Sequence, residues 1–237
     1  MRVLGIESSS LVASVAIVTD GILTAEYTVN LKKTHSQTLL PMIDDMVKLL
    51  GIELSTVDAI AVSGGPGSFT GLRIGSATAK GLGLALDKPL IHVPTLDATA
   101  YNLYGAGALI CPIMDARRNQ VYTGVYRFRE EFEILREQDA MDMGELLEVL
   151  NGLGEPVIFL GDGVPVFKCQ IRERLTVPFS FAPAHVNRQR AAAVAALGAR
   201  YFAEGKMESS DDHRPDYLRK SQAEREREER EAKEGGR

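Results

Sequence analysis

The sequence predicts an α/β fold, and two observations predict it. Short apolar runs typical of buried strands alternate, over the first hundred residues, with longer segments of helical periodicity. A glycine-rich loop at 63–68 leaves one of these strands and opens a helix. Because a buried strand followed by a tight loop and a helix is a recurring unit of α/β proteins, we expect a sheet covered by helices.

The first hundred residues predict the order strand, strand, strand, helix, strand, helix, strand. The first three strands are separated by a polar turn at 7–10 and by Asp20-Gly21, so we expect them to pair antiparallel. In the first helix apolar residues recur at intervals of three and four, and Gly51 suits its end. The strands are expected at 2–6, 13–18, 22–29, 57–62 and 89–93, and the helices at 35–50 and from 69 to about 86.

A strand-turn-strand pattern is repeated after residue 100. Apolar runs at 109–114 and 121–128 flank a polar turn at 117–120. The first strand of each pattern ends in an acidic residue, Glu7 in one and Asp115 in the other. This is the weak internal symmetry expected of a protein with two related lobes.

The second lobe is expected to continue with a buried strand at 157–160 and an alanine-rich helix at 189–203. The final residues are a mixed run of Arg and Glu with almost no apolar side chains, which is typical of a solvated tail. We therefore predict an N-terminal lobe at 1–100, a smaller C-terminal lobe at 101–218 and a charged tail at 219–237.

The composition is that of a cytoplasmic globular protein. The chain has 237 residues, of which 45% are hydrophobic and 25% charged, and no run approaches the ~18 consecutive apolar residues of a membrane span. No export signal is recognisable at the N-terminus, and we expect Cys111 and Cys169 to be reduced and buried. Because its net charge is −5, the chain alone is a poor candidate for binding RNA through the phosphate groups.

The glycine-rich loop is a candidate anion site. Its glycines let backbone N–H groups approach a ligand, and the following helix, capped by Ser68 or Thr70, adds partial positive charge at its N-terminus. The loop matches neither the dinucleotide fingerprint nor the P-loop, so a tight turn needed only for close packing is the alternative. The candidate anion or nucleotide contacts are Gly65, Gly67, Ser68, Thr70, Arg73 and Arg118.

With its flanks, the loop resembles a segment of the TsaB family. The matching residues are Ser63-Gly-Gly-Pro-Gly-Ser-Phe-Thr-Gly-Leu-Arg-Ile-Gly75, and further family landmarks follow in family order at 4–10, 34–41, 114–122 and 215–219. Glu7 departs from the pattern, since many relatives have Asp there. The resemblance implies a two-lobed fold of the actin-like, sugar-kinase and Hsp70 class (ribonuclease H-like) with a reduced second lobe.

The resemblance also implies a function in making threonylcarbamoyladenosine (t6A) beside the anticodon of tRNA. TsaB-like chains are non-catalytic scaffolds or activators that dimerise with a TsaD-like catalytic subunit, which transfers the threonylcarbamoyl group. A TsaE-like ATPase resets the complex, and tRNA is reached only indirectly, through the complex. No cofactor is expected to be required, and ATP or ADP is a candidate ligand at the complex interface.

The helix after the loop has small residues at intervals of four, namely Gly71, Gly75, Ala79 and Gly83. Such a stripe permits close approach, either by a partner helix or by the lobe's own sheet. The resemblance implies a partner interface on the helices at 35–50 and 69–86, with Leu39, Ile43, Met46, Leu72, Gly75 and Ala79 as candidates. A homodimer through the same face would compete. We expect a bulky residue at position 75 to abolish partner binding and to leave the fold intact.

No catalytic residue and no metal site are expected in this chain. Alignment through the glycine loop places the metal-binding histidines of the TsaD family at Thr95 and Thr99, and hydroxyls are poor substitutes for imidazole. The four histidines, His35, His92, His185 and His213, are not spaced as ligand pairs. His92 is expected to be packed in the core, and His35 to lie at a helix start.

The alternative function is an autonomous ATP-dependent kinase of small molecules on the same fold. Phosphoryl transfer needs carboxylates near a phosphate-binding loop, and Glu7, Asp115 and the loop at 64–67 are candidates for those roles. Such an enzyme would turn over ATP as a single purified chain.

Overall fold

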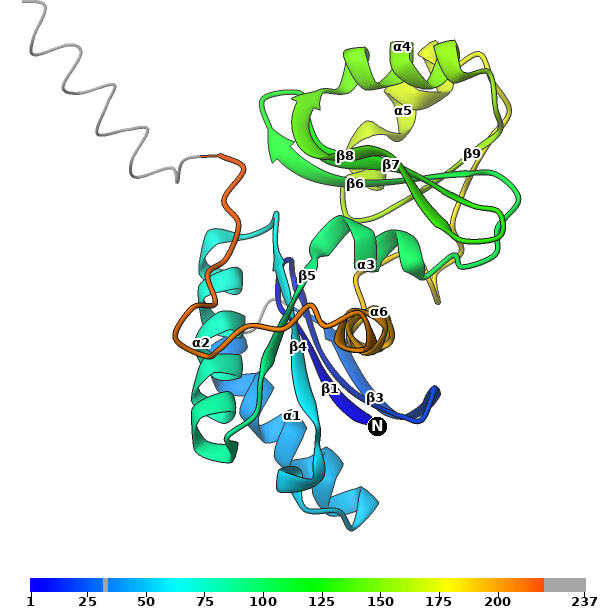
Figure 1. Cartoon of the computed structure of the whole chain (residues 1–237). Helices are drawn as coiled ribbons and strands as arrows, with labels where there is room; N and C mark the ends of the chain where they lie inside the picture. Colours follow the sequence, from blue (N-terminus) through cyan, green and yellow to red (C-terminus); the bar gives the residue numbers. More distant parts are fainter. Residues whose placement is uncertain (32–33, 220–237) are drawn as a thin grey trace, which may run out of the picture.

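Two five-stranded sheets with the same strand order form the frame of the molecule, which the computed structural model describes over residues 1–31 and 34–219 (Figure 1). The order is β3-β2-β1-β4-β5 in the first sheet and β10-β9-β6-β7-β8 in the second, which is the same arrangement written from the other edge. The strands are β1 (Arg2–Glu7), β2 (Val12–Thr19), β3 (Ile22–Asn30), β4 (Ala59–Gly65), β5 (Leu90–Pro94), β6 (Leu109–Arg117), β7 (Gln120–Phe128), β8 (Phe132–Asp142), β9 (Val157–Leu160) and β10 (Phe179–Phe181).

Pairing directions are also the same in the two sheets. β1, β2 and β3 pair antiparallel, and β4 and β5 then join β1 in parallel. Likewise β6, β7 and β8 pair antiparallel, and β9 and β10 follow in parallel. The repetition inferred from the two strand-turn-strand patterns is therefore confirmed, and the chain has the two-lobed actin-like (ribonuclease H-like) α/β fold.

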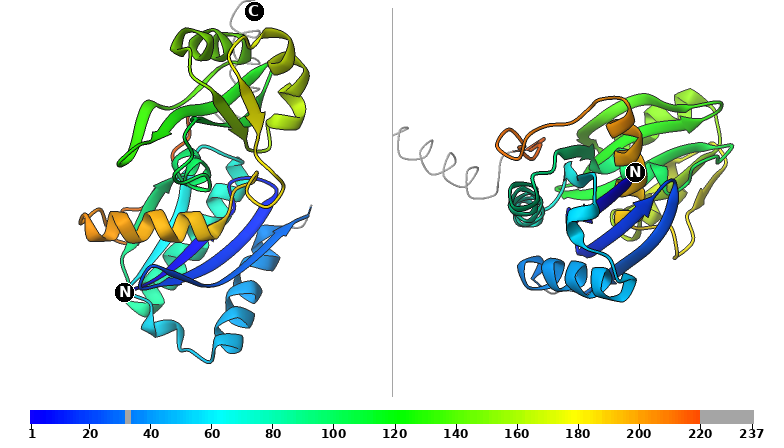
Figure 2. Two further views of the ribbon diagram at one scale, coloured as in Figure 1. Left: turned by 90° about the vertical axis from the view of Figure 1, so that its right-hand side faces the viewer. Right: turned by 60° about the horizontal axis from the view of Figure 1, so that its bottom comes forward.

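Helices cover both faces of the first sheet. α1 (His35–Leu50) and α2 (Phe69–Leu86) pack on one face, and α6 (Ala191–Ala203) lies across the other (Figure 2). The alternation of β1 accounts for this, because Leu4 and Ile6 point into the α1–α2 core whereas Val3 points into the core beneath α6. Gly5 also faces α6, and a Cβ there would lie within 2.5 Å of the Ala191 carbonyl oxygen.

The position of α6 corrects the predicted domain boundary. This helix was assigned to a C-terminal lobe at 101–218, but it packs on the first sheet, and its first amides are bound by first-lobe side chains. Ala191 N donates to Ser14 Oγ at 3.0 Å, and Ala192 N donates to Glu26 Oε1 at 3.2 Å. The apolar side of a helix shows in the sequence that the helix packs against an apolar surface. It does not show which of two sheets provides that surface.

The chain after α6 stays with the first lobe. Glu208 exchanges backbone hydrogen bonds with Leu90 of β5 at 2.9 and 3.0 Å, and Asp216 N donates to Gly64 O at 2.6 Å. We call residues 206–219 the strap, because this segment runs along the first lobe toward the second (Figure 1). Among the described residues, the first lobe is thus built from 1–94 and 191–219.

Three helices complete the second lobe and its junction with the first. α4 (Met143–Leu153) and α5 (Val164–Arg174) cover one face of the second sheet. α3 (Thr95–Tyr101) lies between the sheets and contacts strands of both. Its buried Asp97 accepts hydrogen bonds from Tyr126 of β7 at 2.8 Å and from Tyr201 of α6 at 3.4 Å, and burial raises the Asp97 pKa to about 6.

Several details differ from the sequence-based expectations. The helices α3, α4 and α5 and the strands β8 and β10 were not predicted. Cys111 is buried as expected, but Cys169 is exposed on α5. The predicted tail falls outside the described residues except for Arg219. Among residues 1–31 and 34–219, no helix combines the length and apolar character needed to cross a membrane.

Candidate functional site

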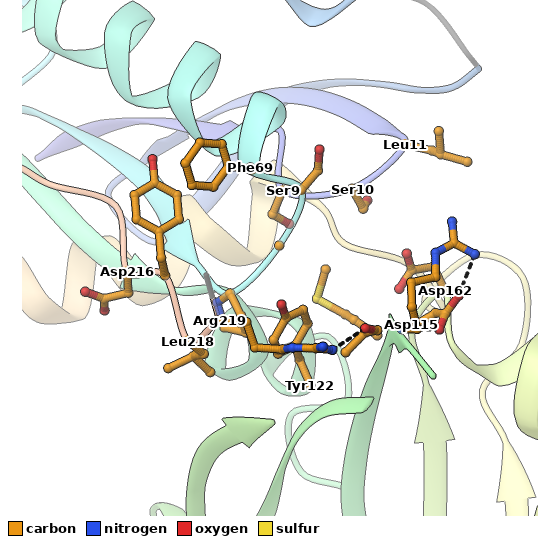
Figure 3. Close-up of a pocket in the computed structure, with 17 residues that line it drawn as sticks. Ser9, Ser10, Leu11, Phe69, Asp115, Tyr122, Asp162, Asp216, Leu218 and Arg219 are labelled. Carbon is orange, nitrogen blue, oxygen red and sulfur yellow. Dashed lines mark hydrogen bonds and ion pairs between the residues drawn. The ribbon is translucent and has the colours of Figure 1, made fainter. Parts of the chain in front are cut away.

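A cleft of about 460 Å³ opens between the two lobes, at the ends of the equivalent strands β1 and β6 (Figure 3). Its first-lobe wall is formed by the turn after β1 and by the glycine loop before α2. Its second-lobe wall comes from the end of β6 and the loop after β9, and the end of the strap closes one side. The lining residues are Ser9, Ser10, Leu11, Pro66, Gly67, Ser68, Phe69, Met114, Asp115, Ala116, Arg117, Tyr122, Asp162 and 216–219.

The glycine loop packs tightly against two other segments. Ser68 N donates to Ser9 O at 2.6 Å, and a Cβ on Gly67 would collide with the same carbonyl group. Gly65 has a φ of +122°, and a Cβ there would collide with the backbone of Asp216. The peptide bond between Gly65 and Pro66 is cis. These glycines are therefore required by close packing of the β1–β2 turn and the strap on the loop.

The six candidate anion contacts do not converge on one point. Gly67 and Ser68 line the cleft, and Ser68 Oγ caps α2 by accepting from Gly71 N at 3.3 Å. Thr70 is exposed at the start of α2 and does not line the cleft. The Arg73 guanidinium lies over the Phe69 ring, 4.0 Å from its centroid.

The other two candidates lie elsewhere. Gly65 is buried beneath Asp216. Arg118 is exposed in the β6–β7 turn, with a φ of +56°. Neither residue lines the cleft, so among the six only Gly67 and Ser68 face a ligand-sized space.

Glu7, at the end of β1, is sealed beneath the cleft. Its Oε1 accepts from both the backbone N and the Oγ of Ser9, each at 2.6 Å, and its Oε2 is buried with no hydrogen-bond partner among the described residues. Burial raises the pKa of Glu7 to about 7. Because Ser9 covers it, Glu7 does not line the cleft, where the kinase hypothesis would place a carboxylate.

The floor of the cleft on the second lobe is acidic. Asp115 Oδ2 lies 3.0 Å from Arg117 Nη1, and Asp115 Oδ1 accepts from Arg117 N at 2.8 Å. Asp162 Oδ1 is buried with no hydrogen-bond partner among the described residues, and burial raises the Asp162 pKa. The cations that line the same cleft are Arg117, which is paired with Asp115, and Arg219 at the end of the strap, so a phosphate group entering here would meet both signs of charge.

The end of the strap is the part of the cleft wall that was not expected from the sequence to contact a ligand. Tyr217 packs against Phe69 with ring centroids 4.4 Å apart, and the Arg219 guanidinium donates to Ala116 O across the cleft. The only indication in the sequence that this segment has a role was its resemblance to a TsaB-family landmark at 215–219. Asp162 lies between two glycines directly after a buried strand, a position at which functional side chains of α/β proteins are common.

Thr95 and Thr99 lie in α3, and each side-chain hydroxyl takes part in a hydrogen bond. Thr99 Oγ1 donates to Thr95 O at 2.7 Å, and Thr95 Oγ1 accepts from Gly65 N at 3.2 Å. Both side chains are buried. They stabilise the first turn of α3 and its contact with the glycine loop.

The six predicted interface residues are buried in this lobe's own core, which corrects that assignment. Their side chains pack on the sheet side of α1 and α2, and a Cβ on Gly75 would collide with Ser8 Oγ. The small-residue stripe of α2 therefore serves internal packing, the alternative left open by its spacing. These buried residues are Leu39, Ile43, Met46, Leu72, Gly75 and Ala79.

The outer side of the same two helices has a different composition. The large apolar residues Leu40 and Leu84 are 50% and 63% exposed. On α2 they are accompanied by a second row of small exposed residues at intervals of four, Ala77, Gly81 and Ala85. We call these five residues the outer face of α1 and α2.

Two further features shape the outer face. Between the helices lies a groove of about 650 Å³, lined by residues that include Leu40 and Leu82. A Cβ on Gly81 would meet nothing within 4 Å, so no side chain among residues 1–31 and 34–219 covers that position. An exposed apolar surface of this kind is typical of a site for another protein.

Comparison with known proteins gives one consistent family. Residues 24–227 match the family model described as TsaD, tRNA N6-adenosine threonylcarbamoyltransferase. The tRNA threonylcarbamoyladenosine biosynthesis protein TsaB of Bacillus subtilis is 34% identical, and that of Escherichia coli 32%, each over 94% of this chain and 96% of the relative. The solved structure of YeaZ from Pseudomonas aeruginosa is 27% identical with a TM-score of 0.75, over 92% of this chain and 99% of that one.

Proposed function

This chain belongs to the TsaB family of tRNA threonylcarbamoyladenosine biosynthesis proteins, and we propose that within the t6A pathway it is an accessory subunit without catalytic residues of its own. Its partner is a TsaD-like catalytic subunit, which docks on the outer face of α1 and α2. The partner transfers the threonylcarbamoyl group to the tRNA adenosine.

The outer face is the observation on which the proposal rests. One side of α1 and α2 packs against the lobe's own sheet, whereas the outer face exposes Leu40 and Leu84 beside the row Ala77, Gly81 and Ala85. Small residues on a helix let a second helix approach closely, and leucines at the rim add apolar area that the partner removes from water. Helices of a partner subunit are therefore the occupant that fits this surface.

Binding on this face activates the partner only if its active conformation binds more tightly than its inactive one. The subunit then raises the partner's rate without supplying a reacting group. The hydroxyls of Thr95 and Thr99 support this role, because their local hydrogen bonds leave them unsuited to hold a metal ion. The net charge of −5 supports the assignment of tRNA contacts to other subunits.

The proposal includes two further components of the complex. A TsaE-like ATPase resets the assembly after each cycle. ATP or ADP binds at the interface with the partner, where Thr70 and Arg73 are exposed at the start of α2 and available to its phosphates. This nucleotide site is tested by measuring the affinity for ATP and ADP of the complex and of the isolated chain. The proposal requires that the complex bind the nucleotide more tightly.

The partner surface is tested by calorimetry of this chain with the TsaD-like subunit of the same organism. Gly81→Trp should weaken the affinity at least 100-fold, because a large side chain would occupy the space reserved for the partner. Gly152→Trp is the matched control, since Gly152 is also an exposed helical glycine with open space around it, on α4 of the other lobe. Equal affinities for the two variants would contradict the proposal.

Light scattering of the chain alone separates the homodimer from the heterodimer. A chain that is dimeric alone and monomeric as Gly81→Trp would use the same face for self-association. If the wild-type chain formed this dimer and did not bind the TsaD-like subunit, the homodimer would replace the proposed complex.

The kinase-like alternative is tested with the same preparation. A single chain that hydrolyses ATP in the presence of small hydroxylated substrates would support it. The burial of Glu7 beneath Ser9 argues against that outcome, because phosphoryl transfer needs its carboxylate to be accessible to a phosphate-bound metal ion.

A further inference from the structure

Two histidines and a glutamate that lie far apart in the sequence meet on the first lobe. His92 is on β5, and Glu208 and His213 are on the strap. One ligand atom from each of the three lies within 4.8 Å of the other two. None of these residues belongs to the cleft or to the outer face of α1 and α2. We propose that His92, Glu208 and His213 bind a zinc ion that holds the strap on β5.

The burial and pairing of His213 support a ligand at this point. Its side chain is fully buried, and its Nδ1 lies 2.5 Å from Glu208 Oε1. Its Nε2 is also buried and has no hydrogen-bond partner among the described residues. The ring of His92 lies beside it, with centroids 5.7 Å apart. Because the Glu208 carboxylate faces Nδ1, this is the His213 nitrogen that can share an ion with Glu208, and the ion would replace the proton of their hydrogen bond.

The surroundings of His92 fit the same interpretation. His92 Nε2 lies 3.1 Å from Asp216 Oδ2, and carboxylates commonly orient the imidazole rings that bind metals. Asp216 and Glu208 together provide two negative charges near the two rings. Two cations lie nearby, since Arg214 Nη1 and Lys80 Nζ donate to His213 O at 2.8 and 3.4 Å, and the two carboxylates offset their charges.

The donor set selects the ion. Imidazole nitrogens with one carboxylate oxygen suit Zn²⁺, whereas Ca²⁺ and Mg²⁺ prefer oxygen ligands only. Zinc bonds of about 2.0–2.1 Å in a tetrahedron place neighbouring ligand atoms roughly 3.3 Å apart. That separation falls between the 2.5 Å of the Glu208–His213 pair and the 4.8 Å limit of the cluster. Small side-chain rotations therefore suffice to close the site.

An ion here would be structural, because the cluster anchors the strap at two of its points. Between the anchors and the cleft, Asp216 N donates to Gly64 O and Tyr217 packs on Phe69. The ion would thus stabilise the segment that forms one side of the cleft. The site is separate from Thr95 and Thr99, and it is the only such group of three among the described residues.

The test is zinc binding by the full chain after treatment with a chelator. We expect one Zn²⁺ per chain by calorimetry and by elemental analysis, with a melting temperature that rises on addition of the ion. Glu208→Gln should weaken the affinity at least tenfold and remove the thermal shift. His185→Gln is the matched control, because His185 is exposed and outside the cluster.

Three outcomes overturn the proposal. They are the absence of stoichiometric binding, binding that Glu208→Gln and His92→Asn leave unchanged, and binding that His185→Gln weakens equally. Glu208 is partly exposed, so its variant should fold, and the thermal melt of the metal-free form verifies this. Co²⁺ provides a second readout, since its visible absorption should be that of a four-coordinate site in the wild-type chain and weaken in Glu208→Gln.

Discussion

The helical layers of the two lobes occupy equivalent positions and expose different chemistry. In each lobe one helix follows the third strand and another connects the two parallel strands, so α1 and α2 correspond to α4 and α5. The exposed side of α2 is small and apolar, with Ala77, Gly81, Leu84 and Ala85. The exposed side of α5 is mostly charged or polar, and its residues include Lys168, Cys169, Arg172 and Glu173.

The difference teaches that the duplicated architecture alone does not make an interaction surface. Both layers bury an apolar side against their own sheet, as every such helix must. Only the first-lobe layer has a second apolar side, and α2 achieves this with two rows of small residues on opposite sides. The row with Gly75 packs inward, and the row with Gly81 faces solvent.

The largest expected effect comes from the inward row. Gly75→Leu should lower the free energy of unfolding by about 3 kcal/mol or more, because the new side chain collides with Ser8 beneath a packed helix. Urea unfolding followed by circular dichroism measures this. The result would correct the expectation that position 75 affects only partner binding, and an unchanged midpoint would contradict the inward placement of the row.

The two acidic strand ends differ as well, and this produces a pH effect. Glu7 is buried and its pKa is raised to about 7, so between about pH 4.5 and 7 the folded chain binds more protons than the unfolded chain. The free energy of unfolding should therefore fall as pH rises through this range, by about 2–3 kcal/mol. In Glu7→Gln this loss should disappear, so the variant should exceed wild type in stability at pH 8 and match it near pH 5.

The measurement is chemical unfolding of both proteins at a series of pH values. Glu131→Gln removes a charge from an exposed turn and is the control for the change in net charge. Parallel stability curves for wild type and Glu7→Gln would show that Glu7 does not titrate in this range.

A smaller effect is expected from the rim of the outer face. Leu40→Lys and Leu84→Lys should each weaken binding of the TsaD-like subunit about tenfold, or about 1.4 kcal/mol, because each removes exposed apolar area from the contact. The equivalent changes on the second-lobe layer, Leu153→Lys and Val166→Lys, should leave the affinity unchanged. Equal losses on both layers would mean that the comparison between them does not locate the partner.

Much of the first lobe could be predicted from the sequence because its elements have strong periodic patterns. The strands β1 to β5 and the helices α1 and α2 have apolar runs or three-four spacing, and the observed bounds lie within three residues of those expected. The second lobe was harder. β8 exposes much of its length and is rich in charged residues, and β10 has only three residues, so neither has a pattern that stands out.

The site was predicted only in part, for a different physical reason. Small residues at intervals of four along α2 indicated close approach, but the spacing cannot say whether the approaching group belongs to Ser8 of the same chain or to a partner. His92 and His213 were recognised as single residues, and their meeting depends on the return of the strap to β5. Long-range contacts of this kind follow from the topology and leave no local signal in the sequence.

The central claim is that this chain activates a catalytic partner through the outer face of α1 and α2. The most direct measurement is t6A on tRNA, by nucleoside mass spectrometry, in a reconstitution with the TsaD-like and ATPase partners, ATP and threonylcarbamoyl-adenylate. We expect product formation to require this chain, to be restored by Gly152→Trp and not by Gly81→Trp, and to be absent with this chain alone. Equal product without this chain, or with Gly81→Trp in its place, would contradict the account.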